Sequence, residues 1–187
     1  MPATLTKFAP RYEGLSVTRE EYLDLEEDGF QYDVIEGVLH LSPSGEFEHG
    51  GNTGDFIIEM GIYLRKNKIG RVVAEIDVLL PDGGDPLRPD ISFLLFESMH
   101  IVKKHILGTP DLICEVLSPS TKKFDLGKKA DRYLSCGVKE YWIIDPNLKT
   151  IEVWKNVDKK SWKKETGQLL TSEILPGFQI SHSEFFD

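Results

Sequence analysis

One acidic residue stands near the end of a short apolar segment. Glu115 lies within residues 112–117, a run whose other side chains are all apolar. A buried carboxylate is costly unless it is paired or binds a metal ion. Twenty-five residues earlier, Asp90 precedes a second apolar run, residues 91–96. Two carboxylates on neighbouring strands, joined by a lysine from a following helix, would suffice for metal-assisted phosphodiester hydrolysis.

The lysine that would stabilise charge on a phosphate is not on the strand. The residue that shares the strand face of Glu115, two positions later, is Leu117. Lys129 offers a substitute, because it lies four residues after Asp125 and four before Tyr133, which places all three on one helical face. The predicted catalytic residues are therefore Asp90, Glu115 and Lys129.

The metal ligands expected here are oxygen atoms, which accept Mg²⁺ and Mn²⁺ alike. Asp90 and Glu115 supply carboxylates, and the backbone carbonyl of Val116 can add a further oxygen. Three more residues are expected to support these ligands: Glu36 at a hairpin turn, His49 in a loop before a helix, and Asp125.

Ordinary structural roles remain open for several of these residues. Asp90 also fits a turn after Pro89, and Glu36 fits the hairpin turn alone. Lys129 also fits a solvated helix face, while Lys128 points about 100 degrees away from it and is the weaker choice.

The elements that must position these residues are predicted from periodicity and turn signals. Helices are expected over residues 18–29, 52–66 and 125–135, with a capping box at Thr18, Asp125 as N-cap and Gly137 as terminator. A polar loop is expected over residues 43–51 and a hairpin tip over residues 155–164. Strands are expected over residues 32–35, 38–41, 72–74, 78–80, 91–96, 112–117, 141–144, 151–154, 169–175 and 178–180. Helices on a mixed central β-sheet give the class α/β or α+β.

Size and composition indicate an ordinary globular protein. The 187 residues suit a single domain with a loose N-terminal arm over residues 1–15. Residues 1–11 lack the features of a signal peptide, and no apolar run approaches the roughly 20 residues of a membrane span. The two cysteines have no metal-type spacing. We therefore expect a cytoplasmic protein.

The net charge of −9 argues at first against a nucleic-acid partner. The charge is unevenly distributed, because residues 1–60 carry a net charge of −10 and residues 101–164 a net charge of +6. The acidic excess therefore lies outside the segment that holds Glu115 and Lys129. A phosphate-binding face and a merely solubilising set of lysines are both consistent with this pattern.

Several stretches of the sequence resemble a known family. They are residues 32–37 (YDVIEG), 43–49, 88–91 (RPDI), 110–121 (PDLICEVLSPST), 137–138, 140–146 and 175–178, together with Asp125, Lys129 and Tyr133. Over residues 17–187 the chain resembles the Uma family of putative restriction endonucleases, a branch of the PD-(D/E)XK nuclease superfamily.

This resemblance implies a restriction-endonuclease-like core with the site in a cleft at strand ends. Asp90 matches the first metal-binding aspartate of the family, Glu115 the acid of the (D/E)XK motif, and Lys129 a lysine displaced from the strand onto the helix. Glu36 and His49 match recurrent positions of unassigned role. The implied activity is a Mg²⁺-dependent endonuclease acting on DNA, and a homodimer is expected because many such enzymes cut both strands.

Two rival functions remain at the level of sequence. The first is a catalytically inactive interaction module that kept the nuclease fold, favoured by Leu117 in place of the strand lysine and by the negative net charge. The second is a nuclease that uses the same site on RNA. The inactive module predicts no Mg²⁺ binding at Asp90 and Glu115, whereas both nucleases require it.

Overall fold

A six-stranded mixed sheet forms the centre of the molecule. The computed structural model describes residues 9–42, 46–81 and 83–187. The sheet order is β3-β4-β5-β6-β7-β8, with β5 and β6 parallel and all other neighbours antiparallel. The strands are β3 (Gly70–Ala74), β4 (Ile91–Leu95), β5 (Leu112–Val116), β6 (Glu140–Asp145), β7 (Thr150–Asn156) and β8 (Trp162–Thr166). The predicted α+β class, a mixed sheet flanked by helices, is confirmed.

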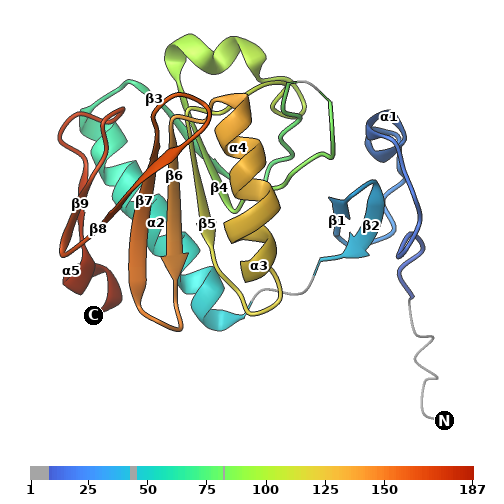
Figure 1. Ribbon diagram of the computed structural model, residues 1–187, viewed down its shortest axis with the longest axis horizontal. Coiled ribbons are helices and arrows are strands. Elements are labelled where there is room, and N and C mark those ends of the chain that lie inside the picture. The colour runs from blue at the N-terminus through green and yellow to red at the C-terminus, as the bar shows by residue number, and fades with distance from the viewer. Residues whose placement is uncertain (1–8, 43–45, 82) are drawn as a thin grey trace.

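Helices cover both faces of this sheet (Figure 1). Helix α2 (Phe47–Lys66) packs Phe56 and Met60 into one core, which also contains Cys114 and Val116 of β5. On the other face lies a continuous helical segment made of α3 (Lys122–Phe124), a π-helical turn η2 (Asp125–Lys129) and α4 (Ala130–Cys136). Strand β5 alternates between the two cores, so Glu115 lies on the α4 side.

The N-terminal lobe, residues 9–42, lies beside the sheet rather than on it (Figure 1). It consists of α1 (Arg19–Leu23) and an antiparallel hairpin of β1 (Tyr32–Ile35) and β2 (Val38–Leu41), with its own small apolar cluster. The hairpin and the capping box at Thr18 are confirmed. Residues 1–8 of the predicted arm lie outside the described residues, and residues 14 and 15 hydrogen-bond Leu39.

Two helix boundaries differ from the prediction near the N-terminus. Helix α1 ends at Leu23 rather than Gly29, because residues 24–28 are mostly acidic and acids are unfavourable at a helix C-terminus. Helix α2 begins at Phe47 rather than Asn52, with Glu46 at its N-cap position and Glu48 in its first turn. The predicted loop over residues 43–51 is therefore wrong from Phe47 onward, and residues 43–45 lie outside the described residues.

The helix that carries Lys129 also begins earlier than predicted. It starts at Lys122, so Asp125 lies inside the helical segment instead of capping it. The segment ends as predicted at Gly137, whose φ of 90° is left-handed.

Strand predictions were wrong in four places. Residues 78–80 form only an isolated bridge at Val78, and Phe96 begins a 3-10 helix, η1 (Phe96–Ile101). Strand β8 occupies part of the predicted hairpin tip. The sequence pattern did not predict it, because most side chains of this solvent-facing edge strand are polar. Strands β9 (Leu169–Thr171) and β10 (Gln179–Ser181) form a separate two-stranded sheet instead of completing the main one. A final helix, α5 (His182–Phe186), follows β10.

Candidate active site

Asp90 and Glu115 meet where β4 begins and β5 ends. Ile91 of β4 pairs with Cys114 of β5, which brings the preceding and following residues side by side. The backbone N–H of Asp90 donates to Glu115 Oε2 at 3.1 Å, and the backbone N–H of Val116 donates to Asp90 Oδ2 at 2.7 Å. The two acids are thus fixed by the backbone of each other's strands.

Two side chains from the helix above β5 converge on the second oxygen of Glu115. Lys129 Nζ lies 3.1 Å from Glu115 Oε1, and the hydroxyl of Tyr133 donates to the same oxygen at 2.9 Å. Lys129 Nζ is also 2.8 Å from Asp125 Oδ1, at ion-pair distance. The structure therefore brings together five predicted residues: Asp90 just before β4, Glu115 and Val116 of β5, and Asp125 and Lys129 of the helix.

Leu117 occupies the strand position where a lysine was expected, and it packs in the core. Leu117 is 4% exposed and belongs to the apolar cluster that contains Ala130 and Tyr133. An ammonium group at this position would need a charged partner within that cluster, whereas Lys129 reaches Glu115 from the helix.

Burial dominates the electrostatics of this pair. Glu115 is 1% exposed, and burial raises the pKa of its carboxyl group to about 8, although the Lys129 ammonium partly offsets the effect and Asp90 adds to it. Burial disfavours the charged form of Lys129, but attraction to Glu115 and Asp125 outweighs it and raises the pKa of the ammonium group above its ordinary value. Lys129 is therefore the permanent cation beside Glu115.

His49 approaches from the opposite face of the sheet. It lies in the first turn of α2, not in a loop, and its Nε2 is 3.2 Å from Asp90 Oδ2. The hydrogen bond to Asp90 raises the pKa of the imidazole above its ordinary value, and burial works against that effect. Asp90 is therefore contacted by both α2 and β5.

Glu36 lies apart from the carboxylates. It occupies the hairpin turn between β1 and β2, where its φ of 53° is left-handed, and its side chain pairs with Lys128. The Glu36 side chain is 73% exposed. Its observed contact therefore joins the N-terminal lobe to the helix rather than supporting Asp90 or Glu115.

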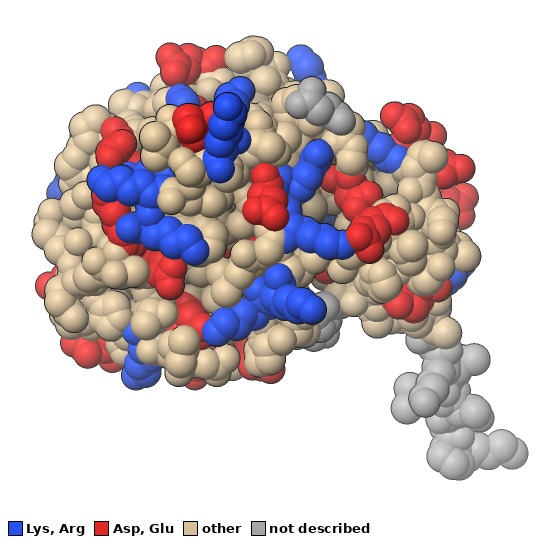
Figure 2. Space-filling view, in the orientation of Figure 1, with Lys and Arg blue, Asp and Glu red and all other residues tan. Residues whose placement is uncertain are grey.

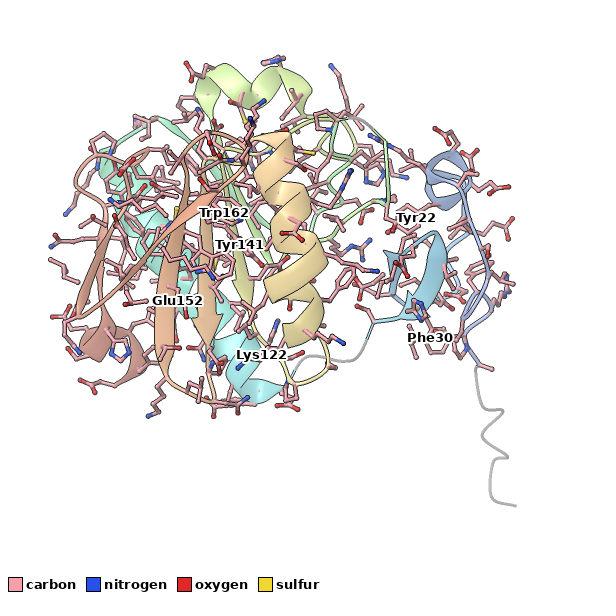
Figure 3. The ribbon with its side chains drawn as sticks, in the orientation of Figure 1. Tyr22, Phe30, Lys122, Tyr141, Glu152 and Trp162 are labelled. Atoms are coloured by element: carbon pink, nitrogen blue, oxygen red, sulfur yellow. The ribbon has the colours of Figure 1, made fainter. Side chains whose placement is uncertain are left out.

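The acids face a groove of about 690 Å³ between the N-terminal lobe and the core. Phe30 and Asp33 line its lobe side, and Ser118 and Thr121 line the opposite side, just before α3. Figure 3 shows Phe30 on the lobe and Lys122, the first residue of α3, across from it. The site thus opens toward solvent through a walled groove.

Two residues of this region were missed by sequence reasoning as site residues. Tyr133 entered only as a marker of the helix face, although its spacing from Lys129 could have suggested a contact with Glu115. Arg88 also lines the groove and bonds Asp77 and Gln31. Nothing in the sequence links these partners, because they meet only through the docking of the lobe.

Comparison with known proteins assigns this chain to a family. A model of the Uma2 family, described as "Putative restriction endonuclease", matches residues 19–183. The chain belongs to the Uma2 family. Membership supports the activity of a nuclease. The matched residues include all residues of the site described above. No curated protein matches the sequence.

A solved structure shows the same fold as this Uma2 chain. A putative nuclease belonging to DUF820 from Anabaena variabilis superimposes with a TM-score of 0.77 at 21% identity, covering 91% of this chain and 97% of that one. The type IIG restriction endonuclease BpuSI gives a TM-score of 0.40 at 17% identity, covering 72% of this chain and 15% of the other. Among the described residues, no helix is long and apolar enough to cross a membrane.

Proposed function

We propose that this protein is a Mg²⁺-dependent endonuclease that hydrolyses phosphodiester bonds in DNA. The observation that carries the proposal is the meeting of Asp90, Glu115 and Lys129 at the floor of the groove. Two hard carboxylates and one fixed cation are the parts that such hydrolysis requires.

The residues present fit a divalent cation bound by few protein ligands. The described residues contain no group of three or more His, Cys, Asp or Glu side chains placed to hold a metal ion. Mg²⁺ does not require one, because it commonly binds one or two carboxylates and keeps several waters. Burial is the main cause of the raised pKa of Glu115, and the negative charge of Asp90 adds to it, so a cation beside the two carboxylates would offset that charge.

In this proposal Asp90 and Glu115 hold the ion, with the Val116 carbonyl as a further oxygen. The bound ion would supply Lewis acidity and lower the pKa of an attacking water. Lys129 stabilises negative charge on the phosphate, and Tyr133 keeps Glu115 oriented through its hydroxyl. The Val116 amide and His49 fix the carboxylate of Asp90.

The decisive experiment compares the parent protein with Glu115→Gln. Calorimetric titration of Mg²⁺ and Mn²⁺ measures metal binding, and cleavage of supercoiled plasmid, labelled single-stranded DNA and labelled RNA measures activity. We expect the substitution to abolish both, because it removes the carboxylate charge while keeping the size of the side chain. Glu46→Gln is the matched control, since Glu46 lines the same groove but contacts neither Asp90 nor Glu115.

Three results would contradict the proposal. Parental cleavage by Glu115→Gln would remove Glu115 from the mechanism. A folded parent that neither binds metal nor cuts any substrate would favour the inactive interaction module, and cleavage restricted to RNA would overturn the assignment of DNA.

A further inference from the structure

The groove above the carboxylates has a wall on each side, which bears on the form of its substrate. Building on the proposed nuclease function, we infer that the groove binds a single unpaired DNA strand in preference to duplex DNA. Three properties of the groove support this: the depth of its acids, the charge of its lining and the aromatic side chains in or beside it.

The acids lie at the bottom of the groove and not on an open face. Glu115 is 1% exposed and the side chain of Asp90 is 21% exposed. The N-terminal lobe stands on one side of the groove, and α2 and the segment before α3 stand on the other. A phosphate must enter between these walls to reach Asp90 and Glu115. A flexible single strand can do so, whereas a stiff duplex would have to bend or give up a strand.

The lining of the groove is acidic. Six acidic and two basic side chains line it, and the acids are Asp33, Glu46, Glu75, Asp90, Glu115 and Asp125. Duplex DNA carries one charge per about 1.7 Å of its axis, and each strand alone carries one per about 3.4 Å. Repulsion therefore weighs less against a single strand. Figure 2 shows that acidic side chains also gather on the N-terminal lobe, which forms one wall.

Two aromatic side chains lie in or beside the groove. Phe30 lines the groove from the lobe. Phe47 is 90% exposed at the first residue of α2, and it neighbours Gly50, three residues later on the helix and part of the groove wall. Bases of a single strand stack on such rings whatever their sequence, while the bases of a duplex are not available for stacking.

The first test measures binding by fluorescence anisotropy with a labelled 20-nucleotide probe. The probe is offered as single-stranded DNA, as duplex DNA and as RNA, to the parent in chelator and to Glu115→Gln in Mg²⁺. We expect single-stranded DNA to bind about tenfold more tightly than the duplex. Duplex binding that is equal or tighter would overturn the inference, and tighter binding of RNA would overturn the choice of DNA.

Phe47→Ala tests the stacking surface. We expect it to weaken single-strand binding about tenfold, as for loss of one stacked base. Ile58→Ala is the control, because Ile58 is a 57% exposed apolar residue on the same helix that does not line the groove. Equal affinities of these two variants would exclude Phe47 from the binding surface.

A pair of adjacent glycines tests contact with the α2 wall. A Cβ atom at Gly50 or at Gly51 would meet nothing within 4 Å, and only Gly50 lines the groove. Alanine at either position favours the helix, so both variants should raise the thermal midpoint by about 2–4 °C. Only Gly50→Ala should weaken single-strand binding, because its methyl group enters the path of the strand. Equal binding by the two variants would contradict that path.

Failure of this inference is distinct from failure of the nuclease proposal. If Glu115→Gln loses cleavage but duplex DNA binds and is cut as well as a single strand, the nuclease proposal stands and the substrate preference is wrong. If Glu115→Gln cuts like the parent, the catalytic assignment fails whatever the probes show.

Discussion

At the scale of single residues, Glu115 is held by donors from two different segments. The backbone of Asp90 binds one of its oxygens, and Lys129 and Tyr133 bind the other. Such a carboxylate has little rotational freedom, which favours a fixed role at the site over a solvent-exposed one.

Replacement of Lys129 by methionine should reduce DNA cleavage at least about 100-fold, because it removes the fixed cation beside the phosphate. Single-turnover cleavage measures the effect. Lys128→Met is the matched control: Lys128 is the adjacent residue, and its side chain pairs with Glu36 at the surface. Cleavage at the parental rate by Lys129→Met would assign the charge stabilisation to another group.

Asp145 gives a prediction for the dependence of stability on pH. Burial raises the pKa of its carboxyl group, but hydrogen bonds from Lys122 and the backbone of Leu148 outweigh that effect and lower the pKa below its ordinary value. As the pH falls below about 4, the unfolded chain binds a proton before the folded one does. The stabilisation by Asp145 is therefore complete above that pH and is lost below it.

The measurement is the free energy of unfolding in urea between pH about 3 and 6. We expect the stability of Asp145→Asn to fall less steeply than that of the parent over this range, because an amide does not titrate. Parallel curves for the two proteins would show that Asp145 does not contribute to the acid sensitivity.

At the scale of elements, a π-helical turn carries Lys129. Residues 125–129 interrupt an otherwise α-helical segment, and both ends of the turn, Asp125 and Lys129, are buried toward Glu115. Such turns occur frequently at functional sites. Here the turn places Lys129 beside Glu115 of β5, while Leu117 packs in the core.

The end of that segment makes a further prediction. Gly137 has a left-handed φ of 90°, which costs other residues about 1 kcal/mol or more. We expect Gly137→Ala to lower the free energy of unfolding by about that amount. Gly127→Ala is the control, because Gly127 has no left-handed φ and a Cβ there would meet nothing within 4 Å. Equal changes in urea unfolding for the two variants would contradict this explanation.

At the scale of the whole molecule, polar contacts attach the N-terminal lobe to the core. Tyr22 of α1 donates to Asp77 at 3.2 Å and lies between α1 and the core in Figure 3, and burial together with Asp77 raises the pKa of its hydroxyl group to about 12. Arg88 bonds Asp77 at 2.8 Å and Gln31 at 2.7 Å. The lobe thus forms a groove wall without sharing the apolar core.

Loss of Arg88 should loosen the lobe selectively. In Arg88→Met we expect faster amide exchange in β1 and β2, by the equivalent of about 1–3 kcal/mol of local stability, with exchange in β5 and β6 unchanged. Arg71→Met, on the exposed side of β3, serves as control. Uniformly faster exchange across both regions would show that the lobe and the core unfold together.

The sequence by itself determined the class of fold, the segment around Glu115, and Asp90 and Lys129 as the residues that act with it. An ionisable residue inside an apolar strand is informative because burial makes it costly, and Lys129 could be found from helical spacing alone. The hairpin, the capping box and the end of the helix at Gly137 followed from local turn chemistry, which depends on neighbouring residues only.

Only the tertiary structure decided which of these residues meet. It placed His49 on α2 against Asp90 and drew Glu36 to Lys128 instead of to the site. It also set the N-terminal lobe beside the sheet, where it walls the groove. These contacts join residues far apart in the chain, and their energies come from packing and polar pairing across elements, which local periodicity does not encode.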